Sequence, residues 1–456
     1  MEEKAVIKNQ IIEGVIWKQL LLFFFPILFG TFFQQLYNTI DTVIVGHFVG
    51  KEALACVGGS TSQIVNLTVG FFTAVASGAA VVIAQFFGAN DERSVEESLH
   101  TAFAFSIIGS IIITILGIVL APSLLSWMHT PAELMNDSTT YLRIYFAGTL
   151  FIFIYNIGSS ILRAIGDSKT PLFYLIYCCV INIILDLVFV VFFKMGVAGV
   201  AIATIISQAI SAVMVTVKLM REKGILRLIL KEIRIYPYVL KSQLRVGIPA
   251  GVQSIMYNIT NVIIQAALNT FGTDTVAAWS VYGKLDALFW MMSGAFGIAI
   301  TTFVGQNYGA GKTDRVLKST RVCLAIDGTA SLTLTLFLIF FRGILFRIFT
   351  NDPAVIQIGS DMLFLIAPWY LSFIFIEVLS GALRGIGDVI IPTLITLIGV
   401  CALRIIWIIG ALNIHPTVEA IIFSYPVTWL STAVLFIVYY IYRVHKLKKK
   451  ALYQCM

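Results

Sequence analysis

The feature that most constrains this chain is a succession of apolar stretches, each long enough to cross a bilayer, which needs about 20 residues. Only 12 % of the residues are charged and 59 % are hydrophobic, whereas a soluble domain is about 25 % charged and about 45–50 % apolar. The sequence therefore predicts an all-α integral membrane protein and excludes a soluble domain, a disulfide scaffold and a nucleic-acid-binding protein. Twelve transmembrane helices are predicted, beginning near residues 17, 57, 97, 138, 169, 196, 244, 276, 320, 357, 389 and 419.

The basic residues gather on one side of the membrane when the spans are numbered from a cytoplasmic N-terminus. Of the 31 Lys and Arg residues, 24 then fall on the cytoplasmic side and five on the other, while Lys284 and Arg404 lie within spans. Because cytoplasmic loops carry an excess of Lys and Arg, this distribution predicts that both termini are cytoplasmic. Glu2, Glu3 and Glu13 precede the first apolar stretch, and we expect no cleavable signal peptide.

The two halves of the chain repeat one another at an offset of 221 residues. Residues 162–167 (LRAIGD) recur as 383–388 (LRGIGD), and residues 85–89 (QFFGA) recur as 306–310 (QNYGA). In each LRxIGD motif, the Gly predicts a tight turn out of a helix and the Asp predicts a cap on the next one. Six spans per repeat give both halves the same orientation, which predicts two six-helix lobes related by a pseudo-two-fold axis along the membrane normal. The predicted domains are an N-lobe (1–218), a basic cytoplasmic linker (219–243), a C-lobe (244–442) and a basic cytoplasmic tail (443–456).

Polar side chains inside predicted spans are the candidate functional residues, because an ionisable group is costly in the bilayer. In the first half, Asp41 and Asp186 are the two acids, and the spacing of four residues places Asn182 on the same helical face as Asp186. Such oxygen-rich groups suit a proton or a hard monovalent cation; the alternative for each is a hydrogen bond between helices. The full set in this half is Gln34, Tyr37, Asn38, Asp41, Asn156, Asn182, Asp186 and Thr204.

The second half lacks this acid pair at the corresponding positions but carries polar residues of its own. Glu377 lies in the tenth predicted span and Arg404 in the eleventh, and together they form a possible C-lobe polar site, either functional or a satisfied ion pair. Lys284 and Asp286 in the eighth span either form a second pair or lie near the membrane face. The different polar contents of the two lobes suggest that the N-lobe carries ion coupling.

Over essentially its whole length the chain resembles the multidrug and toxic compound extrusion (MATE) family. The resemblance rests on residues 37–46 (YNTIDTVIVG), residues 305–310 (GQNYGA), the doubled LRxIGD motif and the Asn182-x-x-x-Asp186 motif. It implies twelve helices in two lobes and export of small organic, often cationic, compounds against inward H⁺ or Na⁺ by rocker-switch alternating access. We expect no enzyme activity, no catalytic residue, no metal and no cofactor beyond the coupling ion. Membrane lipids are the other expected partners, and we expect a functional monomer in a bacterial plasma membrane.

The resemblance also assigns roles to residues. The seventh span carries no acid up to Phe271, and in this respect the chain resembles the DinF-like branch more than the NorM branch. Pro26 matches a proline that kinks the first helix in relatives. The family's N-lobe cation site maps onto Asp41, Asn182, Asp186 and Thr204, and its cavity positions map onto Gln34, Tyr37 and Asn156, with Asn38 beside them.

The sequence leaves other transport and membrane functions as alternatives. The same fold can host a flippase or an exporter of a lipid-linked or specific metabolite substrate. A flippase predicts a lateral opening and a cationic cavity, whereas the candidates here are mainly acids and amides. An intramembrane enzyme needs clustered Asp residues or an embedded His, and a channel needs a repeated filter loop; the sequence shows neither pattern.

Overall fold

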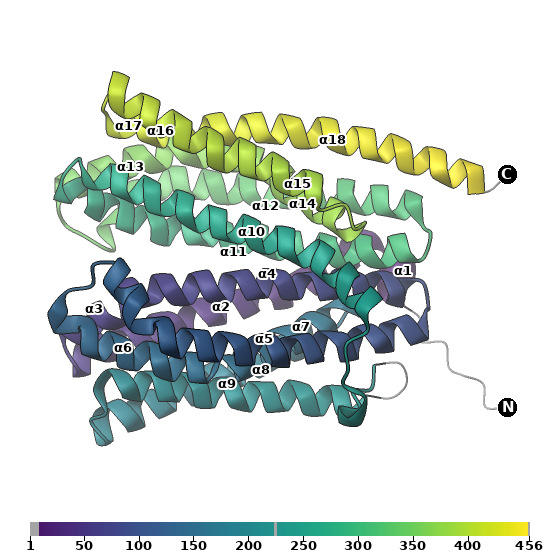
Figure 1. Ribbon diagram of the computed structural model, residues 1–456. Coiled ribbons are helices and arrows are strands. Elements are labelled where there is room, and N and C mark those ends of the chain that lie inside the picture. Colours follow the sequence, from purple (N-terminus) through teal and green to yellow (C-terminus); the bar gives the residue numbers. More distant parts are fainter. Residues whose placement is uncertain (1–8, 223–225, 455–456) are drawn as a thin grey trace. The chain divides into compact units, whose positions relative to one another are not determined.

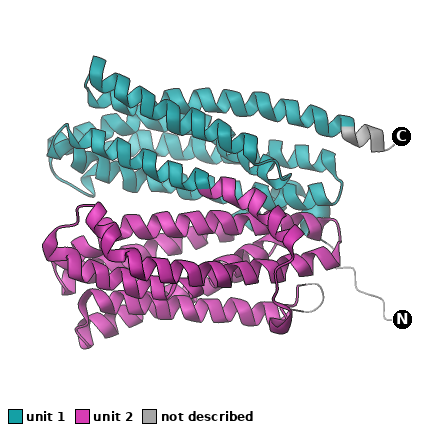
Figure 2. Ribbon diagram, viewed as in Figure 1, with its two compact units in different colours: residues 1–24, 252–456 teal, residues 25–251 magenta. Residues whose placement is uncertain are grey.

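The computed structural model is helical throughout the residues that it describes, 9–222 and 226–454 (Figure 1). Residues 1–8, 223–225 and 455–456, which include parts of the predicted linker and tail, lie outside this description. Contacts divide the chain into unit 1 (residues 1–24 and 252–456) and unit 2 (residues 25–251) (Figure 2). Both boundaries fall inside a long helix, close to its internal proline. The lobe boundaries inferred from the sequence stay a prediction.

Unit 2 consists of helices that follow one another with short connections. It begins within α2 (Ile16–Phe48) and ends within α10 (Pro237–Asn269). Between them lie α3 (Lys51–Gly58), α4 (Ser60–Gly88), α5 (Glu92–Trp127), α6 (Ala132–Ala147), α7 (Thr149–Ala164), α8 (Lys169–Asp186), the π-helix η1 (Leu187–Phe192), α9 (Gly196–Arg221) and the 3₁₀-helix η2 (Leu230–Glu232).

Unit 1 contains α1 (Gln10–Glu13), the start of α2 and the remainder of α10. Helix α18 continues through the predicted basic tail from position 443 up to Gln454. The other elements are α11 (Thr273–Gly309), α12 (Thr313–Arg347), α13 (Pro353–Ile366), η3 (Ala367–Trp369), α14 (Tyr370–Gly385), α15 (Ile390–Thr396), the π-helix η4 (Leu397–Ala402), α16 (Leu403–Ile414), α17 (Val418–Ile422) and α18 (Ser424–Gln454).

The helices are those of an all-helical membrane protein with about ten to twelve membrane helices. Ten spans of the described residues are long and apolar enough to cross a bilayer, and the bent pair α6–α7 makes an eleventh. Helix α10 is 33 residues long but carries more polar residues, such as Lys241, Gln243 and Arg245. The predicted starts near 169 and 196 coincide with the first residues of α8 and α9.

The span predicted from residue 138 is bent by 48° between α6 and α7. The bend lies at Gly148, where the backbone passes close to Ile205 on α9. A Cβ atom at this position would lie 2.4 Å from Cγ1 of Ile205, so only glycine permits this approach. The bend therefore follows from close packing of α9 against the joint between the two helices.

The repeated LRxIGD motif makes the predicted turn in both halves. Gly166 and Gly387 adopt left-handed backbone angles, with φ of 100° and 82°. Asp167 accepts hydrogen bonds from the first two backbone amides of α8, at 3.1 and 3.0 Å, so its predicted capping role is confirmed. The corresponding prediction for Asp388 is wrong. Its carboxylate accepts a hydrogen bond from the Tyr439 hydroxyl at 2.7 Å and forms an ion pair with Arg443 on α18.

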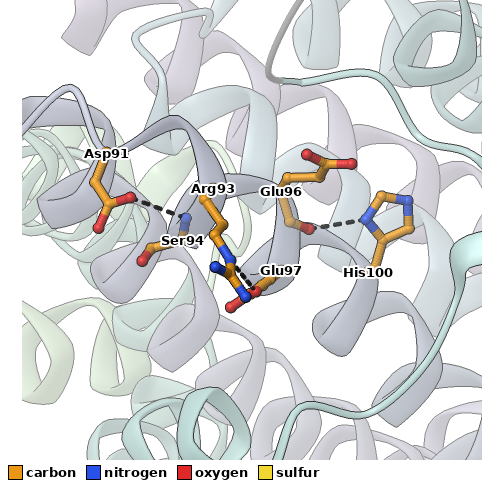
Figure 3. A network of polar contacts seen from close by, with 6 residues as sticks. All are labelled: Asp91, Arg93, Ser94, Glu96, Glu97 and His100. Carbon is orange, nitrogen blue, oxygen red and sulfur yellow. Dashed lines mark hydrogen bonds and ion pairs between the residues drawn. The ribbon is translucent and has the colours of Figure 1, made fainter.

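A polar network fixes the beginning of α5 (Figure 3). The Asp91 carboxylate accepts a hydrogen bond from the Ser94 amide at 3.1 Å and caps the helix. Hydrogen bonds from Ser94 lower the pKa of Asp91 below its ordinary value. One turn into α5, Arg93 Nε donates to Glu97 at 2.9 Å. These contacts define where the helix emerges from its preceding loop.

The connection between α9 and α10 is held on α5. His100 Nε2 accepts a hydrogen bond from the Ile229 amide at 3.1 Å, so Nδ1 carries the proton and donates to the Glu96 carbonyl at 2.8 Å. Thr101 Oγ1 accepts a hydrogen bond from the Tyr236 amide at 3.1 Å. The described part of the predicted linker is therefore docked along a helix by specific hydrogen bonds.

Candidate functional site

The two acids of the predicted cation site meet inside unit 2. Asp41 comes from α2 and is 7 % exposed, and Asp186 is the last residue of α8 and is 0 % exposed. Their carboxyl groups lie within hydrogen-bonding reach of each other. A hydrogen bond between two carboxyl groups requires a proton on one of them, whereas two ionised carboxylates repel. This geometry suits a pair that holds at least one cation, of which the proton is the smallest.

A change of helix type positions Asp186. Helix α8 ends at this residue, and the π-helix η1 follows directly. A π-helical turn leaves the regular i→i−4 hydrogen-bond ladder, and such turns are frequent at functional sites. The Asp186 side chain caps no backbone amide at this junction, so its carboxyl group is free to face Asp41.

Asn182 and Thr204 add to the buried polar set. Asn182 lies one turn before Asp186 on α8, and Thr204 lies on α9, which packs against α8. Their side chains are 0 % and 3 % exposed. Apart from the contact between the carboxyl groups, the buried polar atoms of Asn182, Asp186 and Thr204 have no hydrogen-bond partner among the described residues. Because buried polar atoms are almost always paired, these orphaned atoms indicate ligand groups.

Three tyrosines lie beside the carboxyl pair. Tyr37 precedes Asp41 by one turn of α2, Tyr141 on α6 lies near both Asp41 and Asp186, and Tyr145 lies near Tyr37. The rings of Tyr141 and Tyr145 stack with centroids 6.3 Å apart. Tyr37 was predicted from the sequence, whereas Tyr141 and Tyr145 were not. Their spacing of four residues on one face of a predicted span was the available signal.

The residues predicted to line one cavity differ in how exposed they are. On α2, Tyr37 is half-buried and Asp41 is buried, whereas Gln34 and Asn38 are exposed. Asn156 on α7 donates a hydrogen bond to the backbone carbonyl one turn earlier at 2.8 Å and faces a separate pocket.

This pocket lies between α4, α5, α7 and the first part of α10. Its walls are apolar apart from Thr73, Ser106, Asn156 and Gln243. Gln243 is fixed in place because its amide donates to the Ser98 carbonyl at 3.0 Å. The cavity volume is about 20 Å³, which is room for about one water molecule, so this conformation has no space there for an organic ligand.

Pro26 lies inside α2, in the helix that also carries Asp41. Proline has no backbone N–H and therefore removes one hydrogen bond from the ladder of the preceding turn. Helix α2 nevertheless stays helical from Ile16 to Phe48. The weakened turn is thus a place where the helix can bend with little cost in hydrogen bonds.

The predicted pairing of Glu377 with Arg404 in unit 1 is wrong. Arg404 Nη2 donates to Thr428 Oγ1 at 2.9 Å, and its guanidinium lies 4.1 Å from the centroid of the Tyr425 ring. A hydrogen bond and a cation–π contact therefore hold this arginine. The Glu377 carboxyl group lies against Gly297 of α11 instead.

The second predicted pair, Lys284 with Asp286, does not form. Asp286 accepts hydrogen bonds from Tyr282 at 3.0 Å, Tyr370 at 2.6 Å and Trp290 at 2.6 Å. Lys284 is exposed. Three aromatic side chains therefore donate hydrogen bonds to the half-buried Asp286 carboxylate, which holds this acid in place without an ion pair.

Asp327 on α12 is a further buried acid, which was not among the site residues predicted from the sequence. It is 0 % exposed and lies near Glu377. Its Oδ1 atom accepts a hydrogen bond from Ser331 at 3.2 Å, and its Oδ2 atom has no partner among the described residues. The signal was available, because Asp327 is an ionisable residue inside the ninth predicted span.

Comparison with known proteins shows similarity along most of the sequence. The sequence model of the MatE family matches residues 26–188 and 249–409. The chain is 31 % identical over 396 residues to the probable multidrug resistance protein YpnP of Bacillus subtilis, which covers 86 % of this chain and 87 % of YpnP. It is 26 % identical over 397 residues to the probable multidrug resistance protein YoeA of the same organism, with 86 % of each chain covered.

Two solved structures show the same fold. One is the outward-facing conformation of a multidrug resistance MATE family transporter of the MOP superfamily, with a TM-score of 0.90 and 21 % identity over 98 % of this chain and 100 % of that one. The other is a MOP superfamily transporter from Pyrococcus furiosus, with a TM-score of 0.91, 21 % identity and the same coverage. The likeness in fold therefore extends through both units.

Proposed function

The chain belongs to the MatE family of MOP superfamily transporters, and on that premise we propose that it exports organic, often cationic, compounds in exchange for inward H⁺. It is a transporter and not an enzyme. In this proposal the exporter works as a monomer in the cell membrane, with both termini cytoplasmic. Alternating access between its two halves carries substrate and proton in opposite directions.

The observation that carries the proposal is the contact between the Asp41 and Asp186 carboxyl groups. One proton placed between them converts a repulsive pair into a hydrogen-bonded one. Protonation from the outer side removes one of the two negative charges of the pair and lowers its affinity for a cationic substrate, which then leaves. Loss of the proton on the inner side restores the charge and the affinity.

For a neutral substrate, the membrane potential is a sufficient driving force with one proton per cycle. Moving one elementary charge through 100 mV is worth about 2.3 kcal/mol. This corresponds to a concentration ratio of about 50-fold. Exchange of one proton for a monovalent cation moves no net charge, so export of such a substrate is driven by the proton gradient, or by a second proton in each cycle.

The substrate class follows from the pocket and from the relatives. The walls of the pocket between α4, α5, α7 and α10 are apolar with four polar side chains, a chemistry that suits a small amphipathic organic compound in a conformation that opens the pocket. The aromatic groups near the acid pair, such as Tyr37 and Tyr141, favour lipophilic cations through contacts with their ring faces.

Sodium is the alternative coupling ion, because Asn182 and Thr204 present unpartnered oxygen atoms that suit a hard cation. We favour the proton, since the direct contact of two carboxyl groups is best explained by a shared proton. The absence of any Asp or Glu from α10 supports placement in the DinF-like branch.

Dye export from cells that lack their own efflux pumps tests the proposal. Wild type, Asp41→Asn and Asp186→Asn are compared with a lipophilic cationic dye, first with a proton gradient alone and then with added sodium. We expect export by wild type without sodium and loss of export in both variants. Asp137→Asn is the matched control, because Asp137 is an exposed acid on α6 of the same unit.

The other outcomes have distinct meanings. Export that requires sodium would show that Na⁺, and not H⁺, is the coupling ion. Export that persists in both variants, at wild-type membrane levels, would remove the N-terminal pair from the mechanism. No dye export by well-folded wild type would favour a flippase or an exporter of a single lipid-linked or metabolite substrate.

A further inference from the structure

Helix α8 carries polar side chains at intervals of one turn, and these lead away from the acid pair. Asn182 and Cys178 precede Asp186 on this helix at successive spacings of four residues. Residues four apart share a helical face, so the three side chains form one stripe. With a rise of about 1.5 Å per residue, the stripe reaches about 12 Å from Asp186. It runs toward the end of unit 2 where α7 ends and α8 begins.

Helix α9 presents a second stripe, made of hydroxyl groups. Thr204, Ser207 and Ser211 lie on one face of this helix and are 3 %, 1 % and 0 % exposed. Because α9 follows α8 after a short connection and packs against it, its later residues lie toward the start of α8. The Cys178 thiol lies beside the Ser211 hydroxyl and is also near Asp41. The two stripes therefore run together from the acid pair.

Helix α7 extends these stripes to the end of unit 2. The Tyr155 hydroxyl donates to the Pro171 carbonyl of α8 at 3.3 Å. Tyr155 also lies near Cys178, and its hydroxyl lies beside Ser159, one turn further along α7. Arg163, in the last turn of α7, is half-buried and acts electrostatically on Tyr155. Polar groups thus follow one another from the acid pair to the arginine of the first LRxIGD motif.

Several of these polar atoms are buried without a hydrogen-bond partner among the described residues. They are both amide atoms of Asn182 and the hydroxyl oxygens of Thr204, Ser211 and Ser159. All four residues are between 0 % and 3 % exposed. A buried polar atom is almost always paired, either with protein or with ordered water. A buried water makes about three hydrogen bonds, so orphaned groups on three neighbouring helices suit water molecules between them.

Close packing of α7 on α9 brings the orphaned hydroxyl groups toward each other. A Cβ atom on Gly158 would lie 2.8 Å from Cγ1 of Val215, so the glycine lets the two backbones approach. Gly158 directly precedes Ser159, and Val215 lies one turn after Ser211. The two serines therefore come from neighbouring turns of two tightly packed helices.

Unit 1 does not repeat the stripe of α8. At the offset of 221 residues, its polar side chains Cys178, Asn182 and Asp186 are replaced by Gly399, Leu403 and Trp407. Tyr155 is likewise replaced by Ile376. Hydroxyl groups do recur at the positions of the α9 stripe, but one of them, Thr428, accepts a hydrogen bond from Arg404. The continuous polar line therefore belongs to the half of the chain that carries the acid pair.

We propose that this polar line, with water between its side chains, carries the proton from the Asp41–Asp186 pair to the end of unit 2 at Arg163. The polar line consists of Asn182, Cys178, Thr204, Ser207, Ser211, Tyr155 and Ser159. Each hydroxyl group or water takes a proton onto its oxygen atom and passes its own hydrogen to the next oxygen, so one proton moves and only O–H bonds change. The Asn182 amide holds water in place through its donor and acceptor atoms. The inference rests on the proposed function, because it assigns the route by which the coupling proton leaves the pair.

Ser211→Val and Ser211→Thr test the polar line with two side chains of the same shape, of which only threonine keeps the hydroxyl group. Both are reconstituted in proteoliposomes with an imposed pH gradient. We expect S211V to export dye about tenfold more slowly than S211T. This loss is smaller than the roughly 100-fold or more that a positioned proton-transfer group contributes, because water bridges part of the gap. Thr216→Val is the control on α9, because Thr216 donates to the Ala212 carbonyl of its own helix at 2.7 Å.

Tyr155→Phe tests a second member of the polar line and keeps the aromatic ring. We expect it to slow export in the same direction as S211V. Tyr177→Phe is the matched control, because Tyr177 lies on α8 and is exposed. Slow export by Y155F at wild-type membrane levels, with normal export by Y177F, would support the route.

Two further readouts separate a proton route from a merely structural role. Equilibrium binding of dye to purified S211V should keep the pH dependence of S211T, because the acid pair is intact. Transport by S211V should slow more in D₂O than transport by S211T, because proton transfer then limits the rate. A wild-type structure at a resolution that shows ordered water should place water against Ser159 and Ser211.

Several results would overturn the polar line while leaving the proposed function in place. These are equal transport rates for S211V and S211T, equal slowing of the two in D₂O, and no ordered water at Ser159 and Ser211. Loss of pH-dependent binding in S211V would also overturn it, because Ser211 would then support the acid pair itself. Failure of the proposed function is recognised separately, since wild type would then export no dye or would require sodium, and the polar line would fall with it.

Discussion

The carboxyl groups of Asp41 and Asp186 lie within hydrogen-bonding reach of each other, although five helices, α3 to α7, separate α2 from α8 in the sequence. The end of α8 and the start of the π-helix η1 set the position of Asp186. Neither carboxyl group is opposed by a basic side chain in an ion pair among the described residues. The occupancy of the pair by a proton is therefore the variable that a transport cycle can use.

Replacing both acids by asparagine should uncouple binding from transport. The D41N/D186N variant keeps two neutral side chains that hydrogen-bond to each other but cannot gain or lose a proton. In wild type we expect proton and substrate binding to be coupled by a factor of about 5 to 150. Equilibrium binding of a cationic dye to the purified variant should show no pH dependence, and proton-driven transport should fall to background. A pH-dependent affinity that survives in the variant would place coupling elsewhere.

Thr428→Val should destabilise unit 1 without abolishing export. Thr428 accepts the hydrogen bond of Arg404, which is 3 % exposed, and a hydrogen bond to a buried charged group contributes about 1.5–3 kcal/mol. We expect a lower thermal midpoint in detergent. Ser431→Ala is the control, because Ser431 lies on the same helix, is exposed and bonds only within α18. Equal midpoints for the two variants would show that the ring contacts with Tyr425 and Trp429 hold the arginine without Thr428.

The Asp91 cap should give the start of α5 a pH dependence. The pKa of Asp91 is lowered by the Ser94 hydrogen bonds, so its contribution to stability is present above the ordinary pKa of aspartate and is lost as pH falls through the folded value. Asp91→Ala should cost about 1 kcal/mol of local stability at neutral pH. Hydrogen exchange at the Ser94 amide measures the effect.

Asp91→Asn separates capping from charge. The amide oxygen still accepts from Ser94, so protection at neutral pH should be close to wild type and should no longer fall in acid. An asparagine variant that loses protection as much as the alanine variant would show that the charge, and not the acceptor, stabilises the helix start.

His100→Phe should release the connection between α9 and α10 from α5. The half-buried Ile229 amide would lose its acceptor, at a cost of about 0.5–1.5 kcal/mol, the net contribution of a typical hydrogen bond. Hydrogen exchange at Ile229 and proteolysis near residue 229 should both accelerate. Glu96→Ala is the control, because the hydrogen bond at that position uses the backbone carbonyl. Unchanged exchange at Ile229 would mean that Thr101 and its neighbours dock the segment without His100.

The sequence allowed the helices to be predicted because each span is set by local composition. The starts of α8 and α9 lie where they were predicted, near residues 169 and 196, and the turns at Gly166 and Gly387 followed from a need for left-handed backbone that glycine meets. The bend at Gly148 was not predicted, because it depends on the approach of Ile205 from a different helix.

The candidate site was predictable in part for the same reason. Asn182 and Asp186 share one helix, so their common face can be read from spacing alone. The partner of Arg404 cannot be predicted from spacing, because Thr428 and Glu377 lie on other helices and only packing decides between them. The π-helix after Asp186 likewise has no clear signature in its six apolar residues.

The central claim is that a proton held by Asp41 and Asp186 drives export, and dye transport in proteoliposomes tests it most directly. The purified protein is reconstituted without sodium, a pH gradient is imposed, and dye movement is followed for wild type, Asp41→Asn and Asp186→Asn. We expect dye to move in the direction opposite to the proton flux in wild type, and we expect only background rates in both variants. Wild-type rates in either variant, or transport that starts only when a sodium gradient is supplied, would contradict it.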